Sequence, residues 1–297
     1  MGNNNGLALS GGGVKAISYI GVLKAFEENN ISFDKIAGTS AGSIIASLYA
    51  GGFSSLEMIK IIKKNISKIK YVDIRSALDI GKLILSFKYK NILGLNNGKS
   101  LENILHDTFI QKGIYNICQI EKELIIPAVN ITNEKLYVFY SKDVFDTGDS
   151  KIVYKNNLLL SKCILASSSY PGIFVPCRID NNFFVDGGLI ENTPWKELKR
   201  IGSDKVLSIC FEKNEVNINN KIVNVLDVIE KSFKVLNDEF NKYELIGAEY
   251  ILKLNIPNYS LLDTKVDIDF LIEEGYRQTK EKINEIKFYF GNWFVFY

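Results

Sequence analysis

The residue with the clearest chemical potential is Ser40, because Gly38 and Gly42 flank it in a G-x-S-x-G pattern. This pattern is typical of a sharp strand-to-helix turn that exposes a serine hydroxyl for nucleophilic attack. Such a serine usually passes its proton to a histidine that an acidic side chain orients. The chain has one histidine, His106, which lies in a helical pattern with polar neighbours. We therefore expect either an inert serine or a serine whose base is another side chain, and the remaining motifs favour the second alternative.

A carboxylate that could act as this base is Asp186, which follows the apolar run 183–185 and precedes Gly187 and Gly188. α/β proteins place their chemistry on loops at strand ends, although a D-G-G string is also a common simple turn. An aspartate near its usual pKa of about 4 is a weak base. It could serve if the site is partly dehydrated and the serine proton moves along a short, direct hydrogen bond.

Three consecutive glycines, Gly11, Gly12 and Gly13, follow a short apolar strand and precede a helical pattern, with Lys15 two residues later. Their backbone N–H groups can converge on an anion, helped by the helix dipole, and glycine allows close approach. A phosphate-binding loop is the alternative, but neither of the glycine-rich nucleotide-binding motifs is present. Beside a serine turn, the loop is expected to be an oxyanion hole for acyl transfer.

Charge is distributed unevenly along the 297 residues, although the net charge is only +2. Residues 60–99 carry ten basic and two acidic side chains, so this window has a net charge of +8. The low overall charge argues against a nucleic-acid partner. The window alternates lysines with apolar residues, and two interpretations remain open. It is either a solvated helical surface packed on the core or an interfacial lid that contacts an anionic membrane.

The composition is that of a globular chain, with 46% hydrophobic residues. No secretory signal and no apolar run of about 20 residues is visible, so we expect a cytoplasmic protein, at most peripheral at a membrane. The four cysteines show neither metal-ligand spacing nor a disulfide pattern, and we expect buried free thiols. No cluster of ligand-type residues predicts a metal, and no cofactor is expected.

Short apolar runs alternate with amphipathic ones, which predicts an α/β fold in one domain over 1–297. Strands are expected over 6–10, 35–38, 124–130, 136–140, 183–185, 205–211 and 250–256. Helices are expected over 16–29, 41–49 and 158–166, beyond residue 224 and over 269–288. The segment 53–97 is interpreted as a lysine-rich, mostly helical insertion or lid.

Taken in order, G-G-G-x-K, G-T-S-A-G and D-G-G resemble the motifs of the patatin-like phospholipases, as do the downstream blocks 166–176 and 186–194. The resemblance implies a three-layer α/β/α fold with a central, mostly parallel sheet. It implies a Ser–Asp dyad in which Ser40 is the nucleophile and Asp186 the base, which explains the missing histidine. By position, the three glycines at 11–13 form the oxyanion hole, and Lys15 stands where the family has arginine or lysine.

The function expected from these motifs is a lipid acyl hydrolase of the phospholipase A or lysophospholipase type, acting on a lipid ester through an acyl-enzyme. Supporting roles fall to Lys15 and to four glycines: Gly38, Gly42, Gly187 and Gly188. An alternative is a non-catalytic or partner-activated lipid-binding protein on the same scaffold. The intact motifs speak against it. The single histidine disfavours a histidine-dependent hydrolase. Lipid class, acyl position and oligomeric state stay open.

Overall fold

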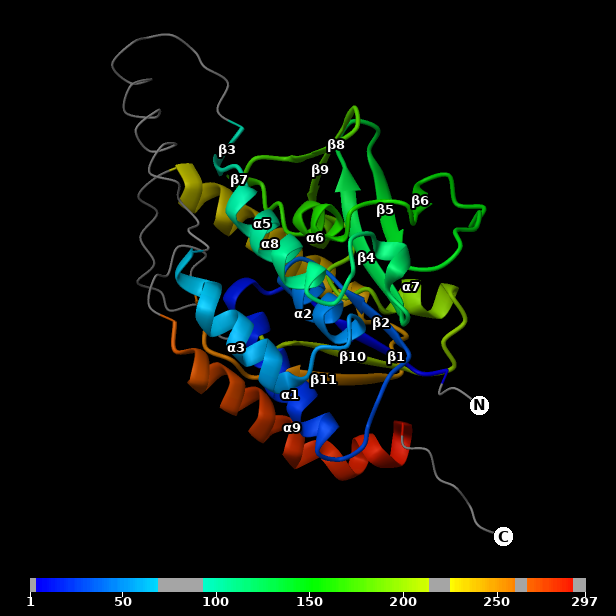
Figure 1. Cartoon of the computed structure of the whole chain (residues 1–297), viewed down its shortest axis with the longest axis vertical. Coiled ribbons are helices and arrows are strands. Elements are labelled where there is room, and N and C mark those ends of the chain that lie inside the picture. The colour runs from blue at the N-terminus through cyan, green and yellow to red at the C-terminus, as the bar shows by residue number, and fades with distance from the viewer. Residues whose placement is uncertain (1–3, 69–92, 214–224, 260–265, 291–297) are drawn as a thin grey trace.

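The computed structural model describes residues 4–68, 93–213, 225–259 and 266–290, and a mixed, mostly parallel sheet lies at its centre (Figure 1). Within these residues the sheet has nine strands: β1 (Gly6–Leu9), β2 (Lys35–Gly38), β4 (Glu123–Asn130), β5 (Lys135–Tyr140), β6 (Ile152–Lys155), β8 (Cys177–Ile179), β9 (Asn182–Asp186), β10 (Val206–Phe211) and β11 (Tyr250–Leu254). A separate pair consists of β3 (Gly94–Asn96) and β7 (Gly172–Phe174).

Helices alternate with these strands along the chain and pack against the sheet (Figure 1). They are α1 (Ser18–Glu27), α2 (Ala41–Ala50), α3 (Ser55–Asn65), α5 (Lys99–Ile110), α6 (Leu160–Ser167), α7 (Trp195–Arg200), α8 (Val225–Glu244) and α9 (Ile268–Phe290). Short 3₁₀ turns are η1 (Gly13–Ile17), η2 (Ile66–Lys68), η3 (Ile117–Gln119) and η4 (Gly187–Leu189).

The strand order is β11-β10-β1-β2-β4-β5-β6, so the chain begins in the middle of the sheet. It proceeds from β1 to β2 and β4 on one side and later returns to β10 and β11 on the other. These five strands are mutually parallel. The direction in which the chain adds strands to the sheet therefore reverses between β1 and β10. Open α/β sheets bind ligands at such reversal points.

Strand β4 carries two shorter strands on one edge, arranged end to end. Its first half pairs with β2 in parallel, through Lys35↔Glu123 to Ala37↔Ile125. Its second half pairs with β9 in the antiparallel sense, from Ala128↔Asp186 to Asn130↔Phe184. β5 occupies the other edge of β4. Because β2 is parallel and β9 antiparallel to β4 along the shared edge, β2 and β9 run toward each other and end at the same place. The turn after β2 and the last residue of β9 are thereby brought together.

The two faces of the sheet pack against two separate cores. Leu7 and Leu9 point into the larger core, which α1, α2, α6 and α9 cover. The intervening Ala8, with Ala37 of β2, faces a smaller core that α7 closes through Trp195. This alternation follows from the two-residue period of a strand. The expected α/β fold with a central, mostly parallel sheet flanked by helices is confirmed.

The expected strands and helices are present with small shifts in their bounds, and some features differ from expectation. The segment 53–97 was expected to be mostly helical: α3 and η2 are helical, its end forms β3, which pairs with β7, and residues 69–92 lie outside the described part. Strands β6 and β8 and helix α7 were not anticipated, because each is short. Cys118 is exposed rather than buried, because η3 places its neighbour Ile117 in the core. The other three cysteines are buried and free, as expected.

Candidate active site

The serine turn between β2 and α2 has a strained backbone at its centre. Ser40 has φ 53° and ψ −128°, a conformation that side-chain-bearing residues rarely adopt and that costs about 1–3 kcal/mol. Two hydrogen bonds with other serines hold this conformation: the Ser40 N–H donates to Ser167 Oγ (3.0 Å), and the Ser43 hydroxyl donates to the Ser40 carbonyl (2.6 Å). The Ser40 hydroxyl thus lies at the N-terminal end of α2, as the G-x-S-x-G pattern predicts.

The glycines on either side of Ser40 allow this turn to lie against β1. A Cβ at Gly42 would lie 2.5 Å from the Ser10 carbonyl oxygen. A Cβ at Gly38 would lie 2.5 Å from the Gly42 carbonyl oxygen. Because both obstacles are backbone atoms, no side-chain rotation could relieve them, and both positions require glycine.

Asp186 meets Ser40 directly. The Ser40 hydroxyl donates to Asp186 Oδ2 at 2.5 Å, and the other oxygen, Oδ1, accepts from the Gly188 N–H at 2.8 Å. The backbone of Asp186 is fixed as well, since its N–H donates to the Ser169 carbonyl (3.0 Å). Gly187 lies against β4, where a Cβ would be 2.3 Å from the Pro127 carbonyl oxygen. Each carboxylate oxygen therefore has a defined partner, and one of these partners is the serine.

The environment of Asp186 makes it a stronger base than an ordinary aspartate. Its side chain is almost fully enclosed, with 3% of the residue exposed. Burial raises the pKa of Asp186 to about 6, while the hydrogen bonds from Ser40 and Gly188 act in the opposite direction. Near pH 7 the carboxylate is mostly ionised and can still take up a proton, as a general base must.

The glycine loop lies beside the serine, between β1 and η1. An ideal Cβ at Gly11 would be 3.2 Å from Ser40 Cβ, so the two segments are in close approach. The Gly11 N–H is already used, because it donates to the Asn192 carbonyl (3.0 Å). In the part of the chain that the structure describes, the Gly12 and Gly13 amides donate to no acceptor. Gly13 has φ 56° and starts η1.

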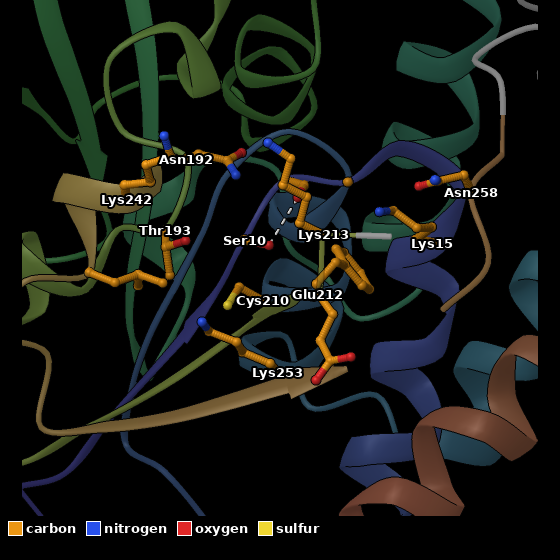
Figure 2. Close-up of a pocket in the computed structure, with 14 residues that line it drawn as sticks. Ser10, Lys15, Asn192, Thr193, Cys210, Glu212, Lys213, Lys242, Lys253 and Asn258 are labelled. Atoms are coloured by element: carbon orange, nitrogen blue, oxygen red, sulfur yellow. Dashed lines mark hydrogen bonds between the residues drawn. The ribbon is translucent and has the colours of Figure 1, made fainter. Parts of the chain in front are cut away.

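Lys15 lies beside Phe211, the last residue of β10. Its ammonium lies 4.7 Å from the centre of the Phe211 ring, and the ring also occupies the space where a Gly12 side chain would be. Lys15, Gly11 and Gly12 line a cavity on the side of the loop that faces β10 and β11 (Figure 2). The glycine loop is therefore a thin wall between the serine and this cavity.

Three residues of the site were not anticipated from the sequence. Ser167 accepts from the backbone of Ser40, Asn192 accepts from Gly11, and Glu244 accepts from the Thr193 N–H at 2.8 Å. Ser167 and Asn192 fall in the downstream blocks 166–176 and 186–194, which were the available signal. Glu244 ends α8 and has no motif around it, so only the fold reveals its role.

His106 lies on α5, half-buried, with its ring 6.3 Å from that of Tyr115. Its neighbour Glu102 is buried and forms ion pairs with Lys99 and Lys162, so this side of the helix is less solvated than its sequence suggests. Among the described residues, no group of three or more metal-binding side chains is placed to hold an ion. No helix in the described ranges has the length and apolar character needed to cross a membrane.

The chain is similar to known proteins in both sequence and fold. The model of the family described as "Patatin-like phospholipase" matches residues 7–199. The Bacillus subtilis protein "Uncharacterized protein YqhO" is 31% identical over 286 residues, which cover 91% of this chain and 95% of that protein.

More distant similarities extend to larger proteins. "Lysophospholipase NTE1" of Scheffersomyces stipitis is 27% identical over 205 residues, which cover 69% of this chain and 11% of that protein. The crystal structure of VipD from Legionella pneumophila superposes with a TM-score of 0.52 at 16% identity, over 95% of this chain and 67% of VipD, and so shares the fold. Because the family model matches more than half of the residues, the chain belongs to the patatin-like phospholipase family.

Proposed function

We propose that this protein is a lipid acyl hydrolase that works through a Ser40–Asp186 dyad and an acyl-enzyme intermediate. The observation that carries the proposal is the 2.5 Å hydrogen bond from the Ser40 hydroxyl to a buried carboxylate with a raised pKa. A hydroxyl hydrogen-bonded to a base within transfer distance is the arrangement that nucleophilic catalysis needs.

In the first step, Ser40 Oγ attacks the ester carbonyl carbon while its proton moves to Asp186 Oδ2. The carbonyl oxygen becomes negative, and the amides of Gly12 and Gly13 are the donors offered to it, since the Gly11 amide is held by Asn192. Collapse of the intermediate breaks the ester bond. The proton passes from Asp186 to the leaving alcohol, and Ser40 remains acylated.

In the second step, water attacks the acyl-enzyme and gives its proton to Asp186. Breakdown of the second intermediate releases the fatty acid and returns a proton to Ser40 Oγ. No step requires a histidine. The hydrogen bond from Gly188 to Oδ1 holds the carboxylate in one orientation, so that Oδ2 faces the serine throughout.

A lipid ester is the proposed substrate because the family is one of lipid hydrolases. The related NTE1 protein is named a lysophospholipase, and this class is included among the candidates. The interpretation of 60–99 as a membrane-contacting segment is untested, since 69–92 lie outside the described residues. The exposed lysines of α3 remain available for such contact.

The test is mass-spectrometric analysis of products from a mixed panel of phospholipids, lysophospholipids and glycerides, with the wild type and Ser40→Ala compared. Fatty-acid release by the wild type alone is the expected result, and the depleted lipid identifies the preferred ester. Labelling by a fluorophosphonate provides a second readout that needs no correct substrate. Wild-type protein that is folded but neither labels nor hydrolyses would overturn the dyad proposal.

A further inference from the structure

The cavity behind the glycine loop lies at the point where the strand order reverses. Its volume is about 260 Å³, and it opens at the carboxyl ends of β1, β10 and β11. Gly11 and Gly12 line it, whereas Ser40 and Asp186 do not. It is therefore a separate space from the dyad, with the glycine loop as the shared wall.

The lining of this cavity is strongly cationic. Figure 2 shows four lysines approaching it from four segments: Lys15 from η1, Lys213 after β10, Lys242 from α8 and Lys253 from β11. Glu212 is the one acidic residue in the described lining, and its carboxylate points away from the lysine ammonium groups in Figure 2. Such a concentration of positive charge around a concave surface favours an anionic group.

Helix α8 presents an unusual apolar surface at the edge of the same cavity. Six large apolar side chains between residues 228 and 246 are 48–69% exposed and repeat at helical spacing. This α8 apolar face consists of Val228, Val235, Leu236, Phe240 and Tyr243 of α8 and of Ile246, in the turn that follows the helix. Lys242 and Leu245, from the same stretch of chain, line the cavity. The apolar face and the cationic cavity are therefore continuous.

Glu244 links this stretch to the glycine loop. Its carboxylate accepts from the Thr193 N–H, and its backbone carbonyl accepts from the Trp195 indole at 2.8 Å. The adjacent Asn192 carbonyl holds the Gly11 amide. The end of α8 is thus connected to the loop beside Ser40 through consecutive hydrogen-bonded segments.

We propose that the α8 apolar face and the lysine-lined cavity form a docking surface for an anionic phospholipid membrane. The apolar side chains enter the interface, and a headgroup phosphate enters the cavity. Charge complementarity identifies the occupant, because an apolar face alone would suit any hydrophobic partner, whereas the adjoining lysines select an anionic one. This inference rests on the proposed lipid-hydrolase function and adds a binding surface outside the 60–99 segment.

The ion pair of Lys242 with Glu239 does not prevent this use. Both side chains are more than half exposed and lie 2.6 Å apart on the helix surface. Exposed pairs of this kind contribute little stability, so a phosphate can compete for the lysine.

The test measures binding to sedimented vesicles in the Ser40→Ala background, so that hydrolysis plays no part. Vesicles of phosphatidylcholine with phosphatidylglycerol are compared with phosphatidylcholine alone. We expect binding to the anionic vesicles to weaken about tenfold or more in Lys242→Gln/Lys253→Gln and by a similar factor in Phe240→Ser/Ile246→Ser. Only the Lys242→Gln/Lys253→Gln variant should lose the preference for anionic over neutral vesicles.

Matched controls lie elsewhere on the surface. Phe288→Ser removes a phenylalanine that is 75% exposed on α9, and Lys280→Gln/Lys282→Gln removes two exposed lysines of the same helix, outside the 60–99 segment. Both should bind as the Ser40→Ala parent does. Thermal unfolding of every variant checks that the fold is intact.

The proposal would be overturned by unchanged vesicle binding in both the Lys242→Gln/Lys253→Gln and the Phe240→Ser/Ile246→Ser variants, or by an equal loss of binding in the α9 lysine control. If the α8 apolar face instead binds a protein, the Phe240→Ser/Ile246→Ser variant would sediment with vesicles normally, which also overturns it. Hydrolysis of a soluble short-chain ester by the wild type is measured separately. Absence of this hydrolysis would contradict the Ser40–Asp186 dyad, whereas the vesicle-binding result would still test the docking surface independently.

Discussion

The two sides of the glycine loop are built on different principles. On the serine side, Ser40 and Asp186 are joined by a short hydrogen bond, and glycines at 38 and 42 lie against backbone oxygens. On the α8 side, lysines surround an open cavity and apolar side chains face solvent. A chemical step requires one geometry, whereas contact with a fluid surface needs charge and apolar area in a tolerant arrangement. Substitutions in the dyad on the serine side should therefore abolish ester hydrolysis, whereas those on the α8 side should weaken membrane binding gradually.

The largest effect is expected from Asp186→Asn. The amide preserves shape and can still accept from Gly188, but it cannot take the serine proton, so kcat should fall by about 10³-fold or more. The assay uses a soluble ester. Asp146→Asn is the matched control, because Asp146 accepts from the Gly148 N–H (2.9 Å) in the same way and is exposed. Retention of activity in Asp186→Asn would show that the serine side holds a different base.

Gly42→Ala tests how rigid the serine side is. In an ordinary helix this change is stabilising by about 1 kcal/mol. Here the new methyl group would lie 2.5 Å from the Ser10 carbonyl oxygen and 2.7 Å from that of Leu9, so we expect destabilisation of about 2 kcal/mol or more. Urea denaturation measures the free energy of unfolding. An increase in stability would mean that the contact between α2 and β1 is looser than the structure shows.

The pH dependence of the reaction sharpens the assignment of the base. With the pKa of Asp186 raised to about 6, kcat/KM for a soluble ester should rise about tenfold per pH unit below that value and level off above it. A midpoint near 4 would indicate a solvated carboxylate and contradict the burial of Asp186.

Glu244→Gln examines the link between the two sides. Burial raises the pKa of Glu244 to about 7, although hydrogen bonds from Thr193 and Asn192 oppose the shift. Because the folded pKa lies above the unfolded value, the stabilising contribution is fully present below about pH 4.5 and is lost as pH rises through about 7. Glutamine can still accept from Thr193 and does not ionise. We expect the variant to gain stability relative to wild type between these values, by on the order of 1 kcal/mol at pH 8.

Urea titrations of wild type and Glu244→Gln at pH 5 and pH 8 give the difference directly. An equal difference at both pH values would show that the carboxylate does not ionise in this range. Vesicle binding of the same variant reports whether the end of α8 depends on this anchor.

Much of the serine side could be predicted from sequence, because local patterns specify it. The glycines around Ser40 are needed for a turn that involves only neighbouring residues and β1, and Asp186 ends a strand that the apolar run 183–185 predicts. What the sequence could not show is why Ser40 and Asp186 meet. The end-to-end placement of β2 and β9 on β4 is a long-range pairing, and residues 146 positions apart converge only after it forms.

The α8 side was less predictable for the same reason. Lys15, Lys213, Lys242 and Lys253 are scattered in sequence, and only the reversal of strand order gathers them. The basic window 60–99 stood out because its ten basic residues fall within one stretch of the sequence. Such a stretch is easy to see in a sequence, whereas a cationic cavity depends on the topology of the fold.

The smallest effect is expected from His106→Ala, which asks whether the serine side depends on a histidine at all. The His106 ring packs near that of Tyr115, while both carboxylate oxygens of Asp186 and the hydroxyl of Ser40 hydrogen-bond to groups other than His106. Loss of a half-buried ring at this position removes packing from α5 and no group from the dyad. Soluble-ester hydrolysis should therefore stay within about twofold of wild type, since general-base catalysis contributes about 10²-fold or more where it operates. A folded His106→Ala protein without activity would place a histidine in the mechanism, and Asp186 would then orient it instead of acting as the base.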